Sequence, residues 1–199
     1  MKIIGITGGV GCGKSRVLDY IESEYRAYVL KADELAQELK LPGQACYDAL
    51  VSLLGEDVLE DTEDRRIDNR KMAQKIFSDP QMLQQVNAIM HPAVKSEILK
   101  RIENCADSGE YDYFILEAAL LIEEGYMEIV DQMWYIYADE QIRRERLKES
   151  RGYSDDKISA IMKSQLTEEE FRNSCQVIIN NSGDWEQTKK HIDQAIASI

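Results

Sequence analysis

Residues 8–15 read Gly8-Gly9-Val10-Gly11-Cys12-Gly13-Lys14-Ser15 and fit the pattern G-x-x-x-x-G-K-[ST]. A loop of this type places backbone N–H groups around the phosphates of a nucleotide. Ile3–Ile6 before it predict a short buried strand, and the apolar residues after it recur at helical spacing, at Val17, Leu18, Ile21 and Tyr25. The motif therefore stands between a strand and a helix. This is the context it requires, and it disfavours the alternative of a simple glycine-rich turn.

Two side chains of the motif have predicted roles. Lys14 reaches the β and γ phosphates of a nucleoside triphosphate, and the Ser15 hydroxyl binds magnesium. The glycines let the loop wrap closely around the phosphates, and the helix that follows adds positive potential at its N-terminus. The sequence thus predicts a site for a nucleoside triphosphate with Mg²⁺.

The chain has 199 residues, of which 44% are hydrophobic and 31% are charged. These values are typical of a soluble globular protein that buries a sizeable core as one domain, with or without insertions. The N-terminal apolar run is too short and too interrupted by glycine to predict a signal peptide or a membrane-spanning helix. Four cysteines without C-x-x-C spacing and two histidines predict no zinc site, and we expect a cytoplasmic protein.

The net charge of −13 argues against general nucleic-acid binding, because a polyanion needs a basic face. Basic residues are nevertheless concentrated in one segment, at Arg143, Arg144, Arg146, Lys148 and Arg151. One interpretation is a solvated helix face that pairs with Glu140, Glu145 and Glu149. The other is a phosphate-binding segment, which the presence of the phosphate loop favours.

A second predicted strand, at 27–30, ends at Lys31-Ala32-Asp33. The carboxyl ends of parallel strands face the ligand crevice of an open α/β sheet, so Asp33 is placed to accept a proton. Its alternative role is an N-cap for a helix that begins at Glu34.

The segment from Leu41 to about Gly109 predicts helices and no convincing strand. Pro92, directly after His91, predicts a break or bend in the last of these helices. An insertion of this kind usually holds the acceptor substrate in small kinases, but periodicity alone would be the same for a purely structural subdomain.

Three further strands are predicted at 113–116, 133–138 and 177–179. The first of them leads to Glu117, a carboxylate that can contact magnesium or its water shell. Five strands joined by helical crossovers predict an α/β fold with a parallel sheet covered on both faces. We expect a single domain with a core at about 1–33, 111–142 and 174–199, a helical insertion at about 34–110 and a lid region at about 143–173.

The sequence resembles the dephospho-coenzyme A kinase family over nearly all of its length. Many kinases share the phosphate loop, but the ordered set of shorter motifs that follows it is far more specific. The set consists of Ala32-Asp33, Gly43, Tyr47, Gly55, Ile67-Asp68, Phe77, His91-Pro92, Leu120-Leu121 with Glu123, Gln141 with Arg144, Gln165, Ile179, Asn181 and Gly183.

The resemblance implies a P-loop kinase core, a helical coenzyme A subdomain and a mobile lid. It implies transfer of the γ-phosphate of ATP to the ribose 3'-hydroxyl of dephospho-coenzyme A, which completes coenzyme A. ATP and Mg²⁺ are the implied cofactors, and dephospho-coenzyme A and ATP are the implied partners. We expect neither a nucleic acid nor a membrane as a partner.

The resemblance also implies the site residues. Lys14, Asp33 and Arg144 are the expected catalytic residues, with Asp33 as the base, and the acceptor is expected to contact Asp33, His91 and Glu123. For His91 a structural role is the alternative. Magnesium is expected at Ser15, with Glu117 as a further ligand through water. ATP is expected to contact Gly9, Val10, Gly11, Cys12, Gly13, Lys14, Ser15, Arg144, Asn181 and Gly183, the last two near its adenine.

The chain departs from the family pattern chiefly on the acceptor side, at Lys31, Gln37, Asn69 and Ala119. In the lid, Arg146 and Arg151 are both candidates for a second arginine. Two other functions stay open: a P-loop kinase for another small acceptor, such as a nucleoside or nucleotide, and a nucleotide-dependent switch that acts on a protein partner. The lid cluster favours phosphoryl transfer, because a closing lid excludes water that would hydrolyse ATP.

Overall fold

β1 (Lys2–Thr7) is the central strand of the sheet in the computed structural model, which describes residues 1–77, 79–118, 121–122 and 125–199. The strand order is β2-β3-β1-β4-β5. β1 pairs in parallel with β3 and β4, and β4 pairs in parallel with β5. The prediction of an α/β fold on a five-stranded parallel sheet is confirmed. The other strands are β2 (Ala27–Lys31), β3 (Tyr113–Glu117), β4 (Gln132–Tyr137) and β5 (Val177–Asn180).

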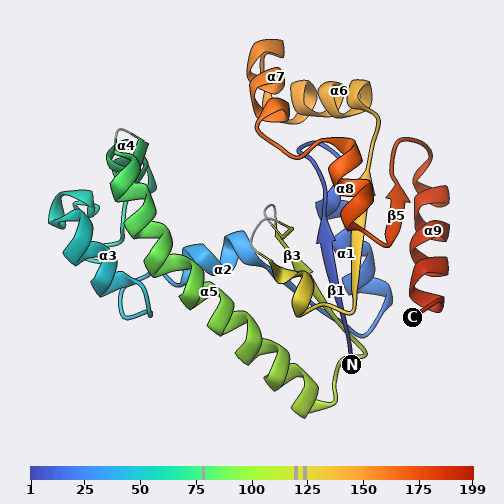
Figure 1. Cartoon of the computed structure of the whole chain (residues 1–199), viewed down its shortest axis with the longest axis horizontal. Helices are drawn as coiled ribbons and strands as arrows, with labels where there is room; N and C mark the ends of the chain where they lie inside the picture. The colour runs from blue at the N-terminus through green and yellow to red at the C-terminus, as the bar shows by residue number, and fades with distance from the viewer. Residues whose placement is uncertain (78, 119–120, 123–124) are drawn as a thin grey trace. The chain divides into compact units, whose positions relative to one another are not determined.

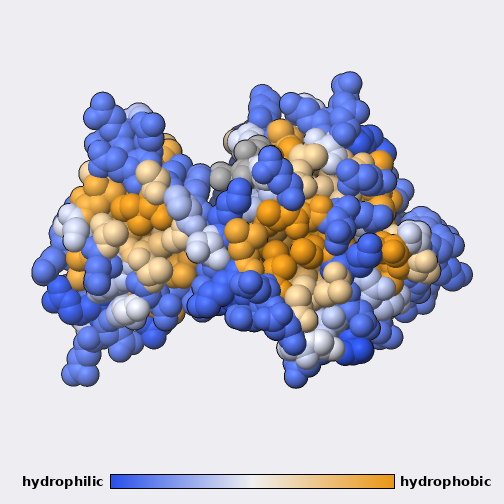
Figure 2. Space-filling model, turned by 60° about the horizontal axis from the view of Figure 1, so that its bottom comes forward, coloured by the Kyte–Doolittle hydropathy of each residue, from blue (hydrophilic) through white to orange (hydrophobic). Residues whose placement is uncertain are grey.

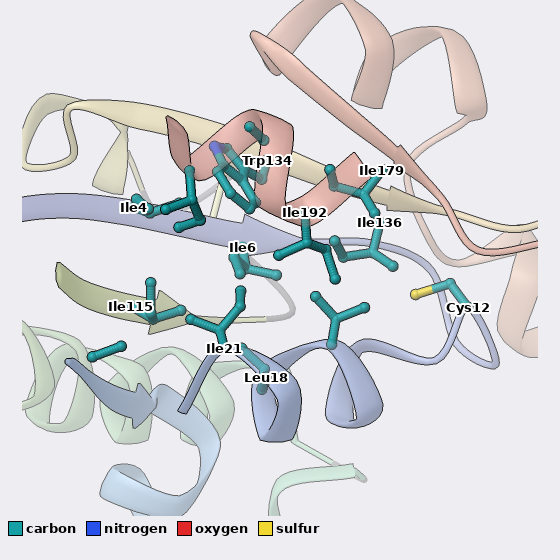
Figure 3. Packing of buried hydrophobic residues seen from close by; sticks show 14 of the residues in the cluster. Ile4, Ile6, Cys12, Leu18, Ile21, Ile115, Trp134, Ile136, Ile179 and Ile192 are labelled. Carbon is teal, nitrogen blue, oxygen red and sulfur yellow. The ribbon is translucent and has the colours of Figure 1, made fainter. Parts of the chain in front are cut away.

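One face of the sheet carries the main hydrophobic cluster, shown in Figure 3. Alternate residues of a strand point to the same face, which brings Ile4 and Ile6 of β1 together with Trp134 and Ile136 of β4. Helices α1 (Lys14–Glu24) and α9 (Trp185–Ala197) add their apolar faces to this cluster. Burying one such large side chain contributes about 1.5–3 kcal/mol, so this face fixes where β1 ends and the loop after it begins.

The opposite face of β4 is covered by α8 (Glu168–Ser174), whose Phe171 ring stacks on Tyr135 with centroids 4.7 Å apart. The capping box of Thr167 and Glu170 fixes the start of α8. Between β4 and α8 lie α6 (Glu140–Arg151) and α7 (Asp155–Lys163), which occupy the predicted lid region (Figure 1). A short 3-10 helix, η2 (Tyr126–Glu128), precedes β4.

The chain divides into two compact units, residues 1–30 with 105–199, and residues 31–104. The second unit is helical, apart from an antiparallel bridge between Leu59 and Ile67. Its elements are α2 (Ala32–Glu38), α3 (Tyr47–Leu54), the 3-10 helix η1 (Glu56–Val58), α4 (Asn69–Phe77) and most of α5 (Pro80–Ser108).

Of the break or bend predicted at Pro92, the break was wrong, because α5 continues through this residue (Figure 1). A proline inside a helix removes one hydrogen bond and costs about 3 kcal/mol. Buried residues recur at intervals of four along α5 on both sides of the proline, at Val86, Met90, Val94 and Ile98. Burial of this continuous apolar face offsets the lost hydrogen bond.

On the face shown in Figure 2, apolar residues lie in patches between hydrophilic ones. Large apolar side chains that are exposed include Leu41, Phe77 and Leu83. None of the described helices is long and apolar enough to cross a membrane.

Candidate nucleotide-binding site

The phosphate loop connects β1 to α1, and its backbone favours glycine at several positions, among them Gly11 and Gly13. Gly11 and Gly13 have φ angles of 79° and 88°, in the left-handed region that favours glycine. At Gly13 a Cβ atom would also lie 2.4 Å from the side-chain nitrogen of Asn181. The sequence pattern is therefore matched by a backbone that only glycine adopts without strain.

Lys14 folds back over the loop. Its ammonium donates a hydrogen bond of 2.7 Å to the carbonyl of Gly8 and lies 3.8 Å from a carboxylate oxygen of Glu117. The two side chains are only 17% and 12% exposed. Glu117 ends β3, and its pairing with Ile6 of β1 places the carboxylate beside the loop. The structure thus brings these two predicted residues together.

The loop is braced by side chains of the predicted lid. Arg143 donates from Nε to the carbonyl of Val10 at 2.8 Å, and the side-chain oxygen of Gln165 accepts from the Val10 amide at 2.9 Å. Arg143 also donates to this Gln165 oxygen, at 3.3 Å. The two side chains therefore hold the backbone of Val10 on both its donor and its acceptor side.

A second brace comes from the C-terminal part of the chain. The Asn181 amide donates to the carbonyl of Cys12 at 2.8 Å, and Arg146 donates to the carbonyls of Cys12 and Asn181 at 3.3 and 2.8 Å. Asn181 is only 3% exposed. Cys12 itself is buried at the edge of the hydrophobic cluster (Figure 3), where it fills space.

The three lid arginines named from the sequence differ in their contacts. Arg146 reaches the loop, as described above. Arg144 instead donates to Glu140 at 2.8 Å and to the hydroxyl of Ser159 at 3.0 Å, so its assigned catalytic role stays a prediction. Arg151 is exposed and lies over the ring of Tyr153 at 5.9 Å.

Sequence reasoning named Arg143 only as a member of the basic segment and Gln165 only as part of the family pattern. The spacing of Arg143 and Arg146 is a signal that was present, because residues three apart share one face of a helix. Gln165 has no local signal, since its partner Val10 lies 155 residues earlier.

Asn181 and Gly183 were expected near the adenine of ATP. The Asn181 side chain hydrogen-bonds with the phosphate loop and with Thr188, whereas Gly183 is exposed.

Burial raises the pKa of Tyr135, beside the loop on β4, to about 12. This phenol is therefore neutral at physiological pH and adds no charge to the site.

Asp33 lies in the first turn of α2 and is exposed. The helix begins at Ala32 rather than Glu34, and its N-cap residue is Lys31, so the alternative N-cap role of Asp33 was wrong. Lys31 forms an ion pair with Glu34 at 3.0 Å.

Of the other residues expected on the acceptor side, His91 is exposed on α5. Glu123, Ala119 and Leu120 lie outside the described residues.

The residues at the loop fit a magnesium ion carried by a nucleotide. Among the described residues, no group of three or more His, Cys, Asp and Glu side chains could hold a metal ion by itself. Mg²⁺ at a nucleotide does not need such a group, because phosphates and water supply most of its oxygen ligands. Ser15, exposed in the first turn of α1, and Glu117 offer the kind of oxygen atom that this ion prefers.

Comparison of the sequence with known proteins indicates the family to which the chain belongs. The sequence model of the dephospho-CoA kinase family matches residues 2–187. The dephospho-CoA kinase of Carboxydothermus hydrogenoformans is 34% identical over 192 residues, which cover 96% of this chain and 91% of that protein. The dephospho-CoA kinase of Aquifex aeolicus is 35% identical over 199 residues, which cover 100% of this chain and 98% of that protein.

Solved structures agree with the fold. A crystal structure from Thermus thermophilus matches with a TM-score of 0.82 and 29% identity, covering 100% of this chain and 97% of the other. The dephospho-CoA kinase from Campylobacter jejuni matches with a TM-score of 0.73, over the same shares of the two chains. At 19% identity this second likeness concerns the fold alone.

Proposed function

Because the chain belongs to the dephospho-CoA kinase family, we propose that its phosphate loop, Asp33 and lid arginines carry out the transfer of the ATP γ-phosphate to the ribose 3'-hydroxyl of dephospho-CoA. The observation that carries this proposal is the Lys14 ammonium, held inside the loop by the Gly8 carbonyl and beside Glu117. A partly buried cation at this point is ready to exchange the carbonyl for phosphate oxygens.

ATP binds with its phosphates against the backbone amides of residues 9–15. Lys14 leaves the Gly8 carbonyl and contacts the β and γ phosphates, where its charge offsets the charge that grows in the transition state. Ser15 and, through water, Glu117 hold Mg²⁺. When bound, this ion would neutralise part of the charge of the phosphates.

Asp33 takes the proton of the acceptor hydroxyl. The hydroxyl oxygen forms the new bond to the γ-phosphorus, the bond from this phosphorus to the bridging oxygen breaks, and ADP leaves. Asp33 is an exposed carboxylate in the first turn of α2, where it is accessible to the acceptor and able to accept this proton.

The lid arginines complete the site. Arg143 and Arg146 hold the loop in shape through its carbonyls, and Arg144 is the arginine that contacts the transferred phosphate when the lid closes. Closure excludes water, which favours transfer to the acceptor over hydrolysis. We place the protein in the cytoplasm, a compartment in agreement with the four free cysteines.

Measuring ADP release with dephospho-CoA and with a panel of nucleosides and nucleotides tests this function. We expect release to depend on the acceptor and to be fastest with dephospho-CoA. Faster release with a nucleoside or nucleotide would indicate a kinase for another acceptor. Release of ADP and phosphate that no acceptor stimulates would indicate a nucleotide-dependent switch.

A further inference from the structure

Gln165 lies in the short connection between α7 and α8, and its half-buried side chain contacts the phosphate loop. The side-chain oxygen accepts two hydrogen bonds, one from the Val10 amide at 2.9 Å and one from Nη2 of Arg143 at 3.3 Å. The Nε atom of Arg143 donates to the Val10 carbonyl at 2.8 Å. A single neutral oxygen therefore lies between a backbone amide of the loop and a guanidinium.

These two donors are of the kind that binds a phosphate oxygen. Backbone amides of a glycine-rich loop and arginine side chains both recognise phosphates. The guanidinium of Arg143 lies directly against the loop, because a Cβ atom at Gly9 would collide with its Nη2 atom. The Gln165 oxygen thus occupies a position at which an oxygen of a bound phosphate would find the same two donors.

Lys14 shows a similar arrangement in the same loop. Its ammonium donates to a neutral oxygen of the chain, the Gly8 carbonyl, at 2.7 Å. Hydrogen bonds from a cation are stronger when the acceptor is ionised as well. A phosphate oxygen therefore displaces the neutral oxygen from Arg143 by the same rule that moves Lys14 from the Gly8 carbonyl to the phosphates.

We propose that the Val10 amide and Nη2 of Arg143 bind an oxygen of the terminal phosphate of ATP, and that Gln165 competes with this oxygen for the two donors. The proposal rests on the proposed function for the nucleotide in the loop. The exchange breaks no covalent bond and moves no proton. The Gln165 oxygen leaves, the phosphate oxygen accepts both hydrogen bonds, and Nε of Arg143 keeps the Val10 carbonyl. Because Gln165 follows α7, its release couples the end of the lid region to the arrival of ATP.

The test uses two substitutions that change the Gln165 oxygen in opposite ways. Gln165→Glu keeps the size of the side chain and makes the competing acceptor an ionised one, whereas Gln165→Leu removes the acceptor. Gln194→Glu, at an exposed position of α9, is the matched control for the added charge. Equilibrium binding of a non-hydrolysable ATP analogue and of ADP is measured for each protein with Mg²⁺. Circular dichroism confirms that each variant is folded.

The two substitutions should shift the affinity for the ATP analogue in opposite directions. We expect Gln165→Glu to weaken its binding by about 10- to 100-fold, the range of a hydrogen bond to a charged group. Gln165→Leu should strengthen it by about 2- to 10-fold, the range of a neutral hydrogen bond. ADP lacks the terminal phosphate, so its affinity should change much less in both variants. Gln194→Glu should match the wild type.

A Gln165 side chain that only braced the loop would give the opposite signs, because glutamate still accepts from the Val10 amide and leucine does not. Weaker binding of the ATP analogue to Gln165→Leu, with wild-type binding to Gln165→Glu, would therefore overturn the proposal. Equal losses for the ATP analogue and ADP in Gln165→Glu would overturn the assignment to the terminal phosphate.

The role of Arg143 is tested by combining Arg143→Ala with Gln165→Glu. The loss of affinity caused by the glutamate should shrink in the double variant, because the cation that holds the glutamate is gone. An undiminished loss would remove Arg143 from the competition. Failure of the proposed function is seen separately, as wild-type ADP release that dephospho-CoA does not stimulate.

Discussion

The side-chain amide of Asn181 lies 2.8 Å from the carbonyl oxygen of Cys12, to which it donates a hydrogen bond across 169 residues of sequence. Arg146 bonds the backbone carbonyls of both residues, so that one guanidinium joins the phosphate loop to the segment after β5. The shape of the loop therefore depends on side chains outside its own motif.

Asn181→Asp tests this dependence. The change keeps the size of the side chain, but it removes the donor and places a carboxylate against the Cys12 carbonyl. An unsatisfied buried group costs about 1–3 kcal/mol, so we expect a lower melting temperature and a higher KM for ATP. Asn180→Asp is the matched control, because the exposed Asn180 side chain acts as an acceptor for the Ser182 amide and aspartate keeps that role. Equal effects of the two changes would contradict the proposed brace.

Lys14→Ala should preserve the fold and remove a cation from the transferred phosphates. Loss of one strong electrostatic contact in a transition state costs about 2.7–4 kcal/mol, which lowers kcat by about 10²- to 10³-fold. Steady-state rates at saturating substrates, with circular dichroism as the check of the fold, measure the effect. A folded variant with a wild-type rate would remove Lys14 from the mechanism.

Arg143→Ala, Arg144→Ala and Arg146→Ala separate loop bracing from catalysis. We expect the first and third changes to weaken ATP binding, because they release the carbonyls of Val10 and Cys12. Arg144→Ala should instead lower kcat more than ATP affinity, as contacts completed on lid closure do. If kcat of Arg144→Ala is unchanged, Arg144 serves only its contacts with Ser159 and Glu140, and the surface pair with Glu140 is worth at most about 1 kcal/mol.

Asp33→Asn keeps the shape of the proposed base and removes its basicity. It should reduce kcat by about 10²- to 10⁴-fold and leave ATP binding nearly unchanged. Lys31→Asp is the control at the same helix start. It breaks the pair with Glu34 and should keep activity within about an order of magnitude. An active Asp33→Asn enzyme together with an inactive Lys31→Ala enzyme would reverse the assignment.

Stability at high pH should depend on two tyrosines of the sheet unit. The hydroxyls of Tyr20 and Tyr25 both donate to one oxygen of Asp193, at 2.8 and 2.7 Å. Burial and this carboxylate raise the pKa of Tyr20 to about 12, and they raise the pKa of Tyr25 as well. Because these pKa values are raised in the folded state only, the stabilisation that the two protonated tyrosines contribute is complete below pH 10. It is lost as the pH rises from about 10 toward 12.

Urea unfolding at pH 8 to 12 measures this effect. We expect the free energy of unfolding of the wild type to fall steeply above pH 10, and the double change Tyr20→Phe with Tyr25→Phe to flatten the fall. Tyr153→Phe, at a tyrosine of the lid region, is the control. An equally steep fall in the double variant would show that other groups cause the loss.

The sequence carried enough information for the sheet and for the choice of Lys14 and Glu117 as residues near the same phosphates, but it did not predict their direct contact. Both depend on local patterns: a strand of apolar residues, a glycine motif and a carboxylate at a strand end. The contacts of Arg143, Gln165 and Asn181 with the loop could not be predicted, because each joins residues more than 130 positions apart. The course of α5 through Pro92 was also missed, since tertiary packing outweighs a local helix breaker.

The same limit of sequence-based prediction applies to the residues expected on the acceptor side. Departures from the family pattern at Gln37 and Asn69 were visible in the sequence, but only the structure shows that both line one pocket with Lys40. The hydrogen bond from Lys40 to Asn69 joins the turn after α2 to the start of α4, and periodicity within either helix does not predict it.

The central position of β1 has a consequence for the order in which the protein forms. β1 is synthesised before the other four strands of the sheet, yet its neighbours begin at Tyr113 and Gln132, and the phosphate loop after it is held by side chains as late as Asn181. Pairings between such distant segments slow folding, because a long stretch of chain must be ordered before they form. A nascent chain therefore cannot shape its nucleotide site until Asn181 has left the ribosome, and chains that terminate before β5 should not bind ATP.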